Sequence, residues 1–103
     1  MDLVKAAFDY SVRVAELVKH LRSDEKGFPL SDDLLECGVN AGMFLRDPPS
    51  PDKDKALACL NKADYLLDMA ATAGYLTERQ TARIRENGQE LIKMINESGG
   101  IQV

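Results

Sequence analysis

The stretch Ala70-Ala71-Thr72-Ala73-Gly74-Tyr75-Leu76-Thr77-Glu78-Arg79-Gln80 predicts a sharp corner between two helices. Gly74 follows a long run of apolar residues at helical spacing, and glycine can adopt the left-handed conformation that ends a helix. Thr77 and Gln80 then have the spacing of a capping box, in which each side chain hydrogen-bonds the backbone N–H of the other residue. We therefore expect one helix to end at this corner and an antiparallel helix to begin there.

On both sides of this corner, apolar residues recur three and four positions apart. They do so in four segments, at about residues 2–23, 31–46, 51–73 and 77–97. Such a stripe is typical of an amphipathic helix that buries one face. The chain, at 103 residues, has the length of a single domain. We therefore predict an all-α fold, an antiparallel up-and-down four-helix bundle in which residues 1–103 form one domain.

The expected boundaries of these helices rest on residues that favour helix ends. Ser31 is expected to cap the second helix, and Ser50 the third helix, with Pro51 at its first helical position. The sequence Ser98-Gly99-Gly100 is expected to end the fourth helix.

Gly38 and Gly42 lie four residues apart in the second segment and remove side chains from one strip of that helix. This spacing predicts close helix packing, either inside the bundle or at a subunit interface. The third segment has a broader apolar face than one neighbouring helix needs, which indicates a second burial partner, either the remaining helices or another subunit.

The composition indicates a globular chain, with 45% hydrophobic and 29% charged residues. The net charge of −4 disfavours non-specific binding to nucleic acid or to anionic membranes. No run of residues reads as a signal peptide or a transmembrane span, so we expect no membrane contact and a cytoplasmic location. Cys37 and Cys59 lie outside any metal-binding or redox motif and are expected to be reduced, buried thiols.

The sequence offers no set of residues for catalysis. His20 is the single histidine and is expected on the solvated flank of the first helix. A nucleophile with its base, a metal site and a phosphate-binding loop each need residue groupings that are not found here. We therefore expect no enzyme activity, no catalytic residues, no metal and no cofactor.

Three arginines near the start of the fourth helix are a weak candidate for contacts with nucleic-acid phosphates: Arg79, Arg83 and Arg85. Nearby glutamates dilute the positive charge, and no aromatic residues are interleaved for base stacking. The alternative is an ordinary exposed helix face.

Several motifs, in order, resemble one family of small helical proteins: Phe8-Asp9-Tyr10-Ser11-Val12-Arg13-Val14, Phe28-Pro29-Leu30-Ser31, the Leu34–Leu45 run around the two glycines, Gly74–Gln80 and Glu90-Leu91-Ile92-Lys93. This family was first noticed in intervening sequences of bacterial 23S rRNA genes (S23-like proteins) and includes accessory proteins of diversity-generating retroelements. The chain resembles a divergent and shortened member, because Phe44-Leu45-Arg46-Asp47 replaces the usual N-I-x-E and prolines follow directly.

The resemblance implies an antiparallel four-helix bundle and, commonly, a homopentameric ring. It also implies, for some members, an association with nucleic acid or a reverse transcriptase, which the acidic charge of this chain disfavours. Two hypotheses about function follow. The first is a self-associating structural or interaction module without chemistry of its own. The second is a nucleic-acid-associated accessory protein that uses Arg79, Arg83 and Arg85.

Overall fold

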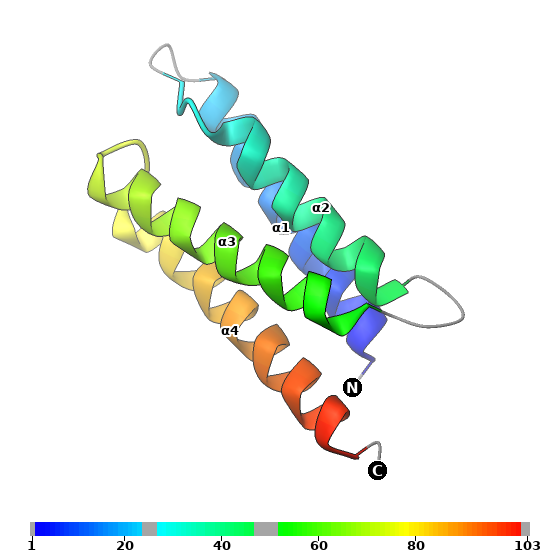
Figure 1. Ribbon diagram of the computed structural model, residues 1–103. Coiled ribbons are helices and arrows are strands. Elements are labelled where there is room, and N and C mark those ends of the chain that lie inside the picture. Colours follow the sequence, from blue (N-terminus) through cyan, green and yellow to red (C-terminus); the bar gives the residue numbers. More distant parts are fainter. Residues whose placement is uncertain (1, 24–26, 47–51, 102–103) are drawn as a thin grey trace.

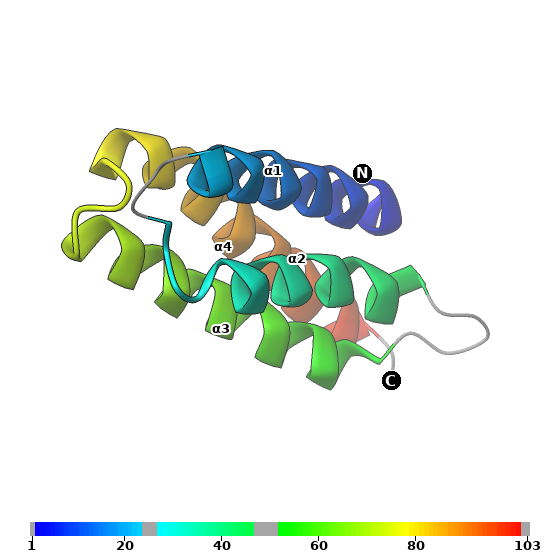
Figure 2. The ribbon, with the colours of Figure 1, turned by 90° about the horizontal axis from the view of Figure 1, so that it is seen from above.

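The computed structural model describes residues 2–23, 27–46 and 52–101. This part of the chain forms four helices: α1 (Leu3–Ser23), α2 (Ser31–Arg46), α3 (Lys53–Thr72) and α4 (Glu78–Ile101). Each helix packs antiparallel against the next, and α1 also packs against α4, so the bundle closes on itself (Figures 1 and 2). The two ends of the chain lie at the same end of the bundle (Figure 1). The predicted all-α four-helix bundle is confirmed.

The core is a single column of aliphatic side chains along a molecule of 49 × 21 × 20 Å. Every helix contributes its apolar stripe, because burial of that stripe is what stabilises an amphipathic helix in a bundle. Its largest fully buried aliphatic side chains are Val14, Val18, Leu21, Leu34, Leu45, Leu60, Leu67 and Ile95.

The corner between α3 and α4 contains the hydrogen bonds that its sequence predicts. Gly74 has a φ of +85°, and the N–H of Tyr75 donates to the carbonyl of Ala70 at 2.9 Å. The N–H of Thr77 donates to Gln80 Oε1 at 2.8 Å, and the N–H of Gln80 donates to Thr77 Oγ1 at 3.1 Å. Both bonds of the capping box are therefore present.

Three helix boundaries differ from the expected ones. Helix α3 begins at Lys53, because the carboxylate of Asp52 accepts from the N–H of Lys55 at 3.0 Å and acts as the N-cap. The expected cap Ser50 and the expected first helical residue Pro51 lie outside the described residues.

At the start of α2, Ser31 is the first helical residue, and its hydroxyl donates to the carbonyl of Phe28. Helix α4 continues to Ile101, so the expected stop at Ser98-Gly99-Gly100 is wrong. Glycine weakens a helix by about 1 kcal/mol against alanine but does not forbid helical dihedrals. Neither of these two glycines adopts the positive φ of a helix-ending residue.

Helices α1 and α2 approach closely where α2 lacks side chains. A Cβ atom on Gly38 would lie 2.6 Å from a side-chain carbon of Val14, and one on Gly42 would lie 2.6 Å from Ser11 Oγ. The Ser11 hydroxyl donates to the carbonyl of Gly38 at 2.7 Å and to that of Ala7 at 3.1 Å. The glycine strip is thus occupied inside the subunit, against α1.

Both cysteines are free thiols; Cys37 is buried and Cys59 is half-buried. Burial raises the pKa of each thiol, which keeps the sulfur protonated and unreactive. Among the described residues, no helix is both long enough and apolar enough to cross a membrane.

Candidate functional site

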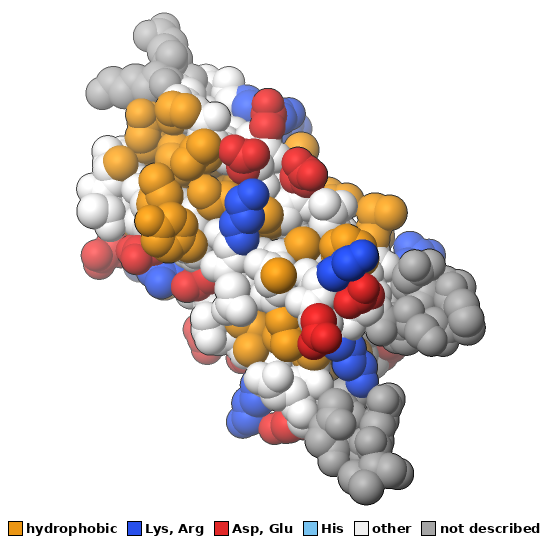
Figure 3. Space-filling view, in the orientation of Figure 1, with side chains coloured by type: hydrophobic (Ala, Val, Ile, Leu, Met, Phe, Trp, Pro, Cys, Tyr) orange, Lys and Arg blue, Asp and Glu red, His pale blue; other side chains and the backbone are white. Residues whose placement is uncertain are grey.

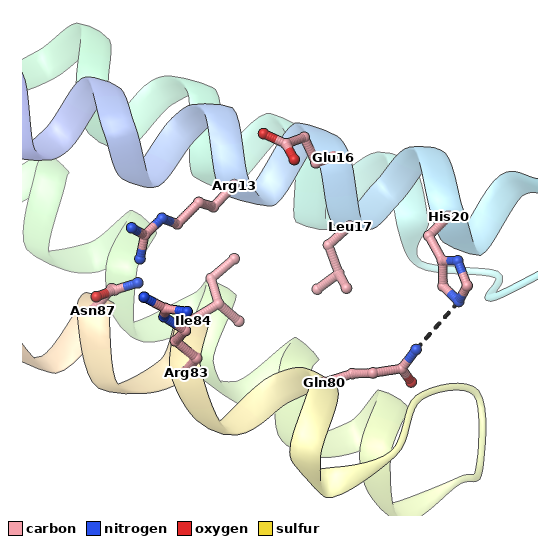
Figure 4. A pocket seen from close by; sticks show the side chains of 8 residues that line it. All are labelled: Arg13, Glu16, Leu17, His20, Gln80, Arg83, Ile84 and Asn87. Carbon is pink, nitrogen blue, oxygen red and sulfur yellow. Dashed lines mark hydrogen bonds between the residues drawn. The ribbon is translucent and has the colours of Figure 1, made fainter.

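A hollow with a volume of about 440 Å³ lies between α1 and α4. We call it the α1–α4 pocket (Figure 4). Polar side chains reach into it from both helices, above two apolar residues. Its lining consists of Arg13, Glu16, Leu17, His20, Gln80, Arg83, Ile84 and Asn87.

One end of the α1–α4 pocket is bridged by His20 and Gln80. Gln80 Oε1 already accepts from the N–H of Thr77, so its amide nitrogen donates to His20 Nε2, 3.3 Å away (Figure 4). The capping residue of α4 therefore also ties the corner to α1, and His20 is exposed, as expected.

The other end of the α1–α4 pocket gathers nitrogen atoms. The guanidinium groups of Arg13 and Arg83 and the amide of Asn87 point toward one another (Figure 4). Asn87 Nδ2 is buried and has no hydrogen-bond partner among the described residues. In that part of the chain neither arginine has a carboxylate oxygen within ion-pair distance, although Arg22 pairs with Asp32.

The three arginines predicted as phosphate contacts are separated by the fold. Arg79 and Arg83 are exposed on α4, whereas Arg85 turns toward α3. Arg85 donates to both oxygens of Asp64, at 2.9 and 3.2 Å, and the hydrogen bond raises the pKa of its guanidinium. Arg85 also lies 3.6 Å from a carboxylate oxygen of Asp68. Contact with nucleic acid stays a prediction for Arg79 and Arg83. Binding to RNA or DNA that weakens steeply as the salt concentration rises would support it.

A second hollow, of about 290 Å³, runs between α1 and α2 on the outside of the bundle. We call it the α1–α2 groove. Most of its side chains are apolar, and five of them are large hydrophobic side chains that are exposed to solvent. Its lining consists of Val4, Phe8, Ser11, Val12, Ala15, Val39, Gly42, Met43 and Arg46.

Helix α3 also leaves apolar surface uncovered. Tyr65 is 66% exposed and Met69 is 37% exposed. On the face formed by α2 and α3, hydrophobic side chains gather near the end of the bundle that carries the α3–α4 corner (Figure 3).

Sequence reasoning missed two residues of these sites. Arg13 reads as one more charge on the solvated side of α1, and Asn87 carries no signal of its own. Only the packing of α1 on α4 brings Arg13 to Arg83 and Asn87, which lie four residues apart on α4. Phe8 lies beside the buried stripe of α1, so periodicity alone assigns it to a widened core face.

The described part of the chain holds no group of three or more His, Cys, Asp or Glu side chains that could bind a metal ion. The titratable groups of this part of the chain are mainly exposed. His20 contacts the amide of Gln80 and not a nucleophile that it could deprotonate as a base.

Comparisons with known proteins agree with this description. No protein-family model matches the sequence, and no curated protein matches it either. The fold is similar to the crystal structure of a protein with unknown function from the S23 ribosomal protein family of Bacteroides thetaiotaomicron VPI-5482, with a TM-score of 0.87. The similarity covers 99% of this chain and 100% of that chain, at 23% sequence identity. The resemblance to S23-like proteins that the sequence predicts is thus confirmed for the fold: this chain is a four-helix bundle of the same architecture as that S23-family protein.

Proposed function

We propose that the protein is a non-enzymatic helical bundle that self-associates and serves as a structural or interaction module. The observation that carries this proposal is the α1–α2 groove. Phe8 is 54% exposed and Met43 is 61% exposed, and Val4, Val12 and Val39 beside them are exposed as well. Exposed apolar side chains that cluster around a hollow are typical of protein–protein contact sites.

A second copy of this chain is the partner that fits the α1–α2 groove. The groove presents bulky side chains, Phe8 and Met43, beside the smaller side chains of Ser11 and Ala15. A surface that carries both a protrusion and a hollow can pair with itself about a twofold axis, as an isologous interface requires.

Molar mass in solution tests this proposal, measured by light scattering behind a sizing column at two protein concentrations. We expect a mass above that of one chain for the native sequence. Phe8→Glu should lower the mass to one chain, because it would bury a charge in an apolar contact. Since Phe8 lies outside the core, the variant should keep its helical circular dichroism.

Tyr65→Glu is the matched control, since it places the same charge on another exposed aromatic residue, on α3. It should leave the mass unchanged. A native chain that is monomeric at both concentrations would overturn the proposal. An assembly that is lost in Tyr65→Glu but kept in Phe8→Glu would move the interface to α3 and contradict the groove as its site.

A further inference from the structure

We propose that the α1–α4 pocket binds a small oxyanion, of the carboxylate or phosphate class, between Arg13 and Arg83. This inference is independent of self-association, because the α1–α4 pocket and the α1–α2 groove share no residues.

The first observation is that two arginine side chains converge without a carboxylate between them. Arg13 comes from α1 and Arg83 from α4, and their guanidinium groups point toward each other (Figure 4). Neither has a carboxylate within ion-pair distance in the described part of the chain, in a protein with more acidic than basic residues. Like charges brought together repel, and an anion between them converts the repulsion into two favourable contacts.

The second observation is the amide of Asn87. Its nitrogen Nδ2 is buried beside the two arginines and lacks an acceptor among the described residues. Buried donors are almost always satisfied, so such a group marks a place where an acceptor binds. Guanidinium and amide N–H groups only donate, so the matching ligand must offer several acceptor oxygens and negative charge.

The acidic neighbours do not fill this role. Glu16 lines the α1–α4 pocket, but its carboxylate lies apart from the three nitrogen-bearing groups (Figure 4). Asp9 and Glu90 line a smaller hollow on the other side of Arg13 and Asn87, where Asp9 lies 3.5 Å from Lys5 Nζ. These carboxylates should weaken, but not replace, binding of an added anion.

The apolar side chains of the pocket indicate what the rest of the ligand is like. Leu17 and Ile84 line it between the arginine end and the His20–Gln80 bridge. A phosphate group or a carboxylate with a short apolar tail fits this combination of donors and apolar wall, because a guanidinium fork matches paired oxygens of either group.

The test is a titration of the full-length protein with inorganic phosphate and, separately, with butyrate, followed by thermal unfolding and calorimetry. Sodium chloride at equal ionic strength is the reference. We expect saturable stabilisation by at least one of the two anions. Arg13→Gln and Arg83→Gln should each weaken binding about tenfold, the usual loss for one charge-assisted hydrogen bond. An effect of phosphate alone or of butyrate alone identifies the group that is bound.

Arg79→Gln is the matched control, an exposed arginine on the same helix outside the pocket, and it should leave binding unchanged. Glu16→Gln should tighten binding, because it removes a competing negative charge from the pocket. In chloride alone, Arg83→Gln should not lower Tm, because it relieves repulsion between the arginines.

The proposal fails if neither anion acts beyond chloride, or if Arg79→Gln weakens binding as much as Arg83→Gln. It also fails if Arg83→Gln lowers Tm equally with and without the anion, since the arginine would then be a structural residue.

Discussion

At the scale of single residues, the absence of a side chain at Gly38 sets how close α2 comes to α1. The nearest atoms to a Cβ at this position belong to Val14, which is fully buried and has no free space to move into. The Ser11 hydroxyl bridges the same seam through the carbonyls of Gly38 and Ala7. The two helices are therefore joined by contact between backbone and short side chains.

Gly38→Ala should lower the free energy of unfolding by about 1 kcal/mol. The added methyl group overpacks the contact with Val14, which costs about 1–3 kcal/mol, whereas replacing glycine by alanine inside a helix gains about 1 kcal/mol. Urea denaturation measures the difference. Val14→Ala makes room for the new methyl group, so the double variant should lose less stability than the sum of the two single variants. Strict additivity would show that Gly38 and Val14 are not in tight contact.

At the scale of elements, the α3–α4 corner combines two ends of helices in one short connection. Gly74 ends α3 with a positive φ, and Thr77 and Gln80 satisfy N–H groups at the start of α4. The ring of Phe28, from the first loop, packs on Tyr75 with ring centroids 5.1 Å apart. The corner is thus held both by its own hydrogen bonds and by the neighbouring loop.

Thr77→Ala should lower the free energy of unfolding by about 1 kcal/mol, because the N–H of Gln80 would lose its side-chain acceptor and keep only the backbone carbonyl of residue 77. Chemical denaturation provides the measurement. Thr72→Ala is the control at the end of α3, where the hydroxyl donates only to the exposed side chain of Asp68, at 3.4 Å. That change should stay within about 0.5 kcal/mol. Equal losses of stability in Thr77→Ala and Thr72→Ala would contradict the prediction that the Thr77 hydroxyl stabilises the start of α4 as its cap.

At the scale of the whole molecule, Tyr10 is a buried phenol at the contact between α1 and α4. It belongs to α1, a Cβ on Gly88 of α4 would touch its ring at 3.3 Å, and it is buried. Burial raises the pKa of its phenol, and the negative charge of Asp64 on α3 raises it further, as does Cys37 on α2 when its thiol ionises at alkaline pH. The ionised form is therefore disfavoured in the folded bundle and accepted in the unfolded chain.

Because the pKa of Tyr10 is higher in the folded state, its contribution to stability is complete below the unfolded value of about 10 and is lost as pH rises above it. The loss should reach up to about 1.4 kcal/mol per pH unit. Tyr10→Phe should reduce this alkaline loss, and denaturation at several pH values above neutrality measures it. Tyr65→Phe, on an exposed tyrosine, should leave the loss as in the native chain. An equal reduction in both variants would contradict the assignment.

The order of the four helices, their antiparallel arrangement and the α3–α4 corner were predictable from the sequence. These features depend on neighbouring residues: apolar spacing defines each helix, and Gly74, Thr77 and Gln80 are close enough along the chain to form the corner alone. Helix ends without a strong stop were less predictable, since α4 continues through Gly99 and Gly100 when nothing requires it to end.

The candidate sites were decided by tertiary packing. Arg13, Arg83 and Asn87 meet only because α1 closes against α4, and Arg85 is withdrawn only because Asp64 lies opposite it on α3. The α1–α2 groove likewise exists because the glycine strip of α2 is occupied by Ser11 and Val14, which leaves Phe8 and Met43 outside. Local patterns specify which face of a helix is apolar. Which side chains of two helices face each other depends on the rotation and spacing of both, and those are set by the packing of the whole core.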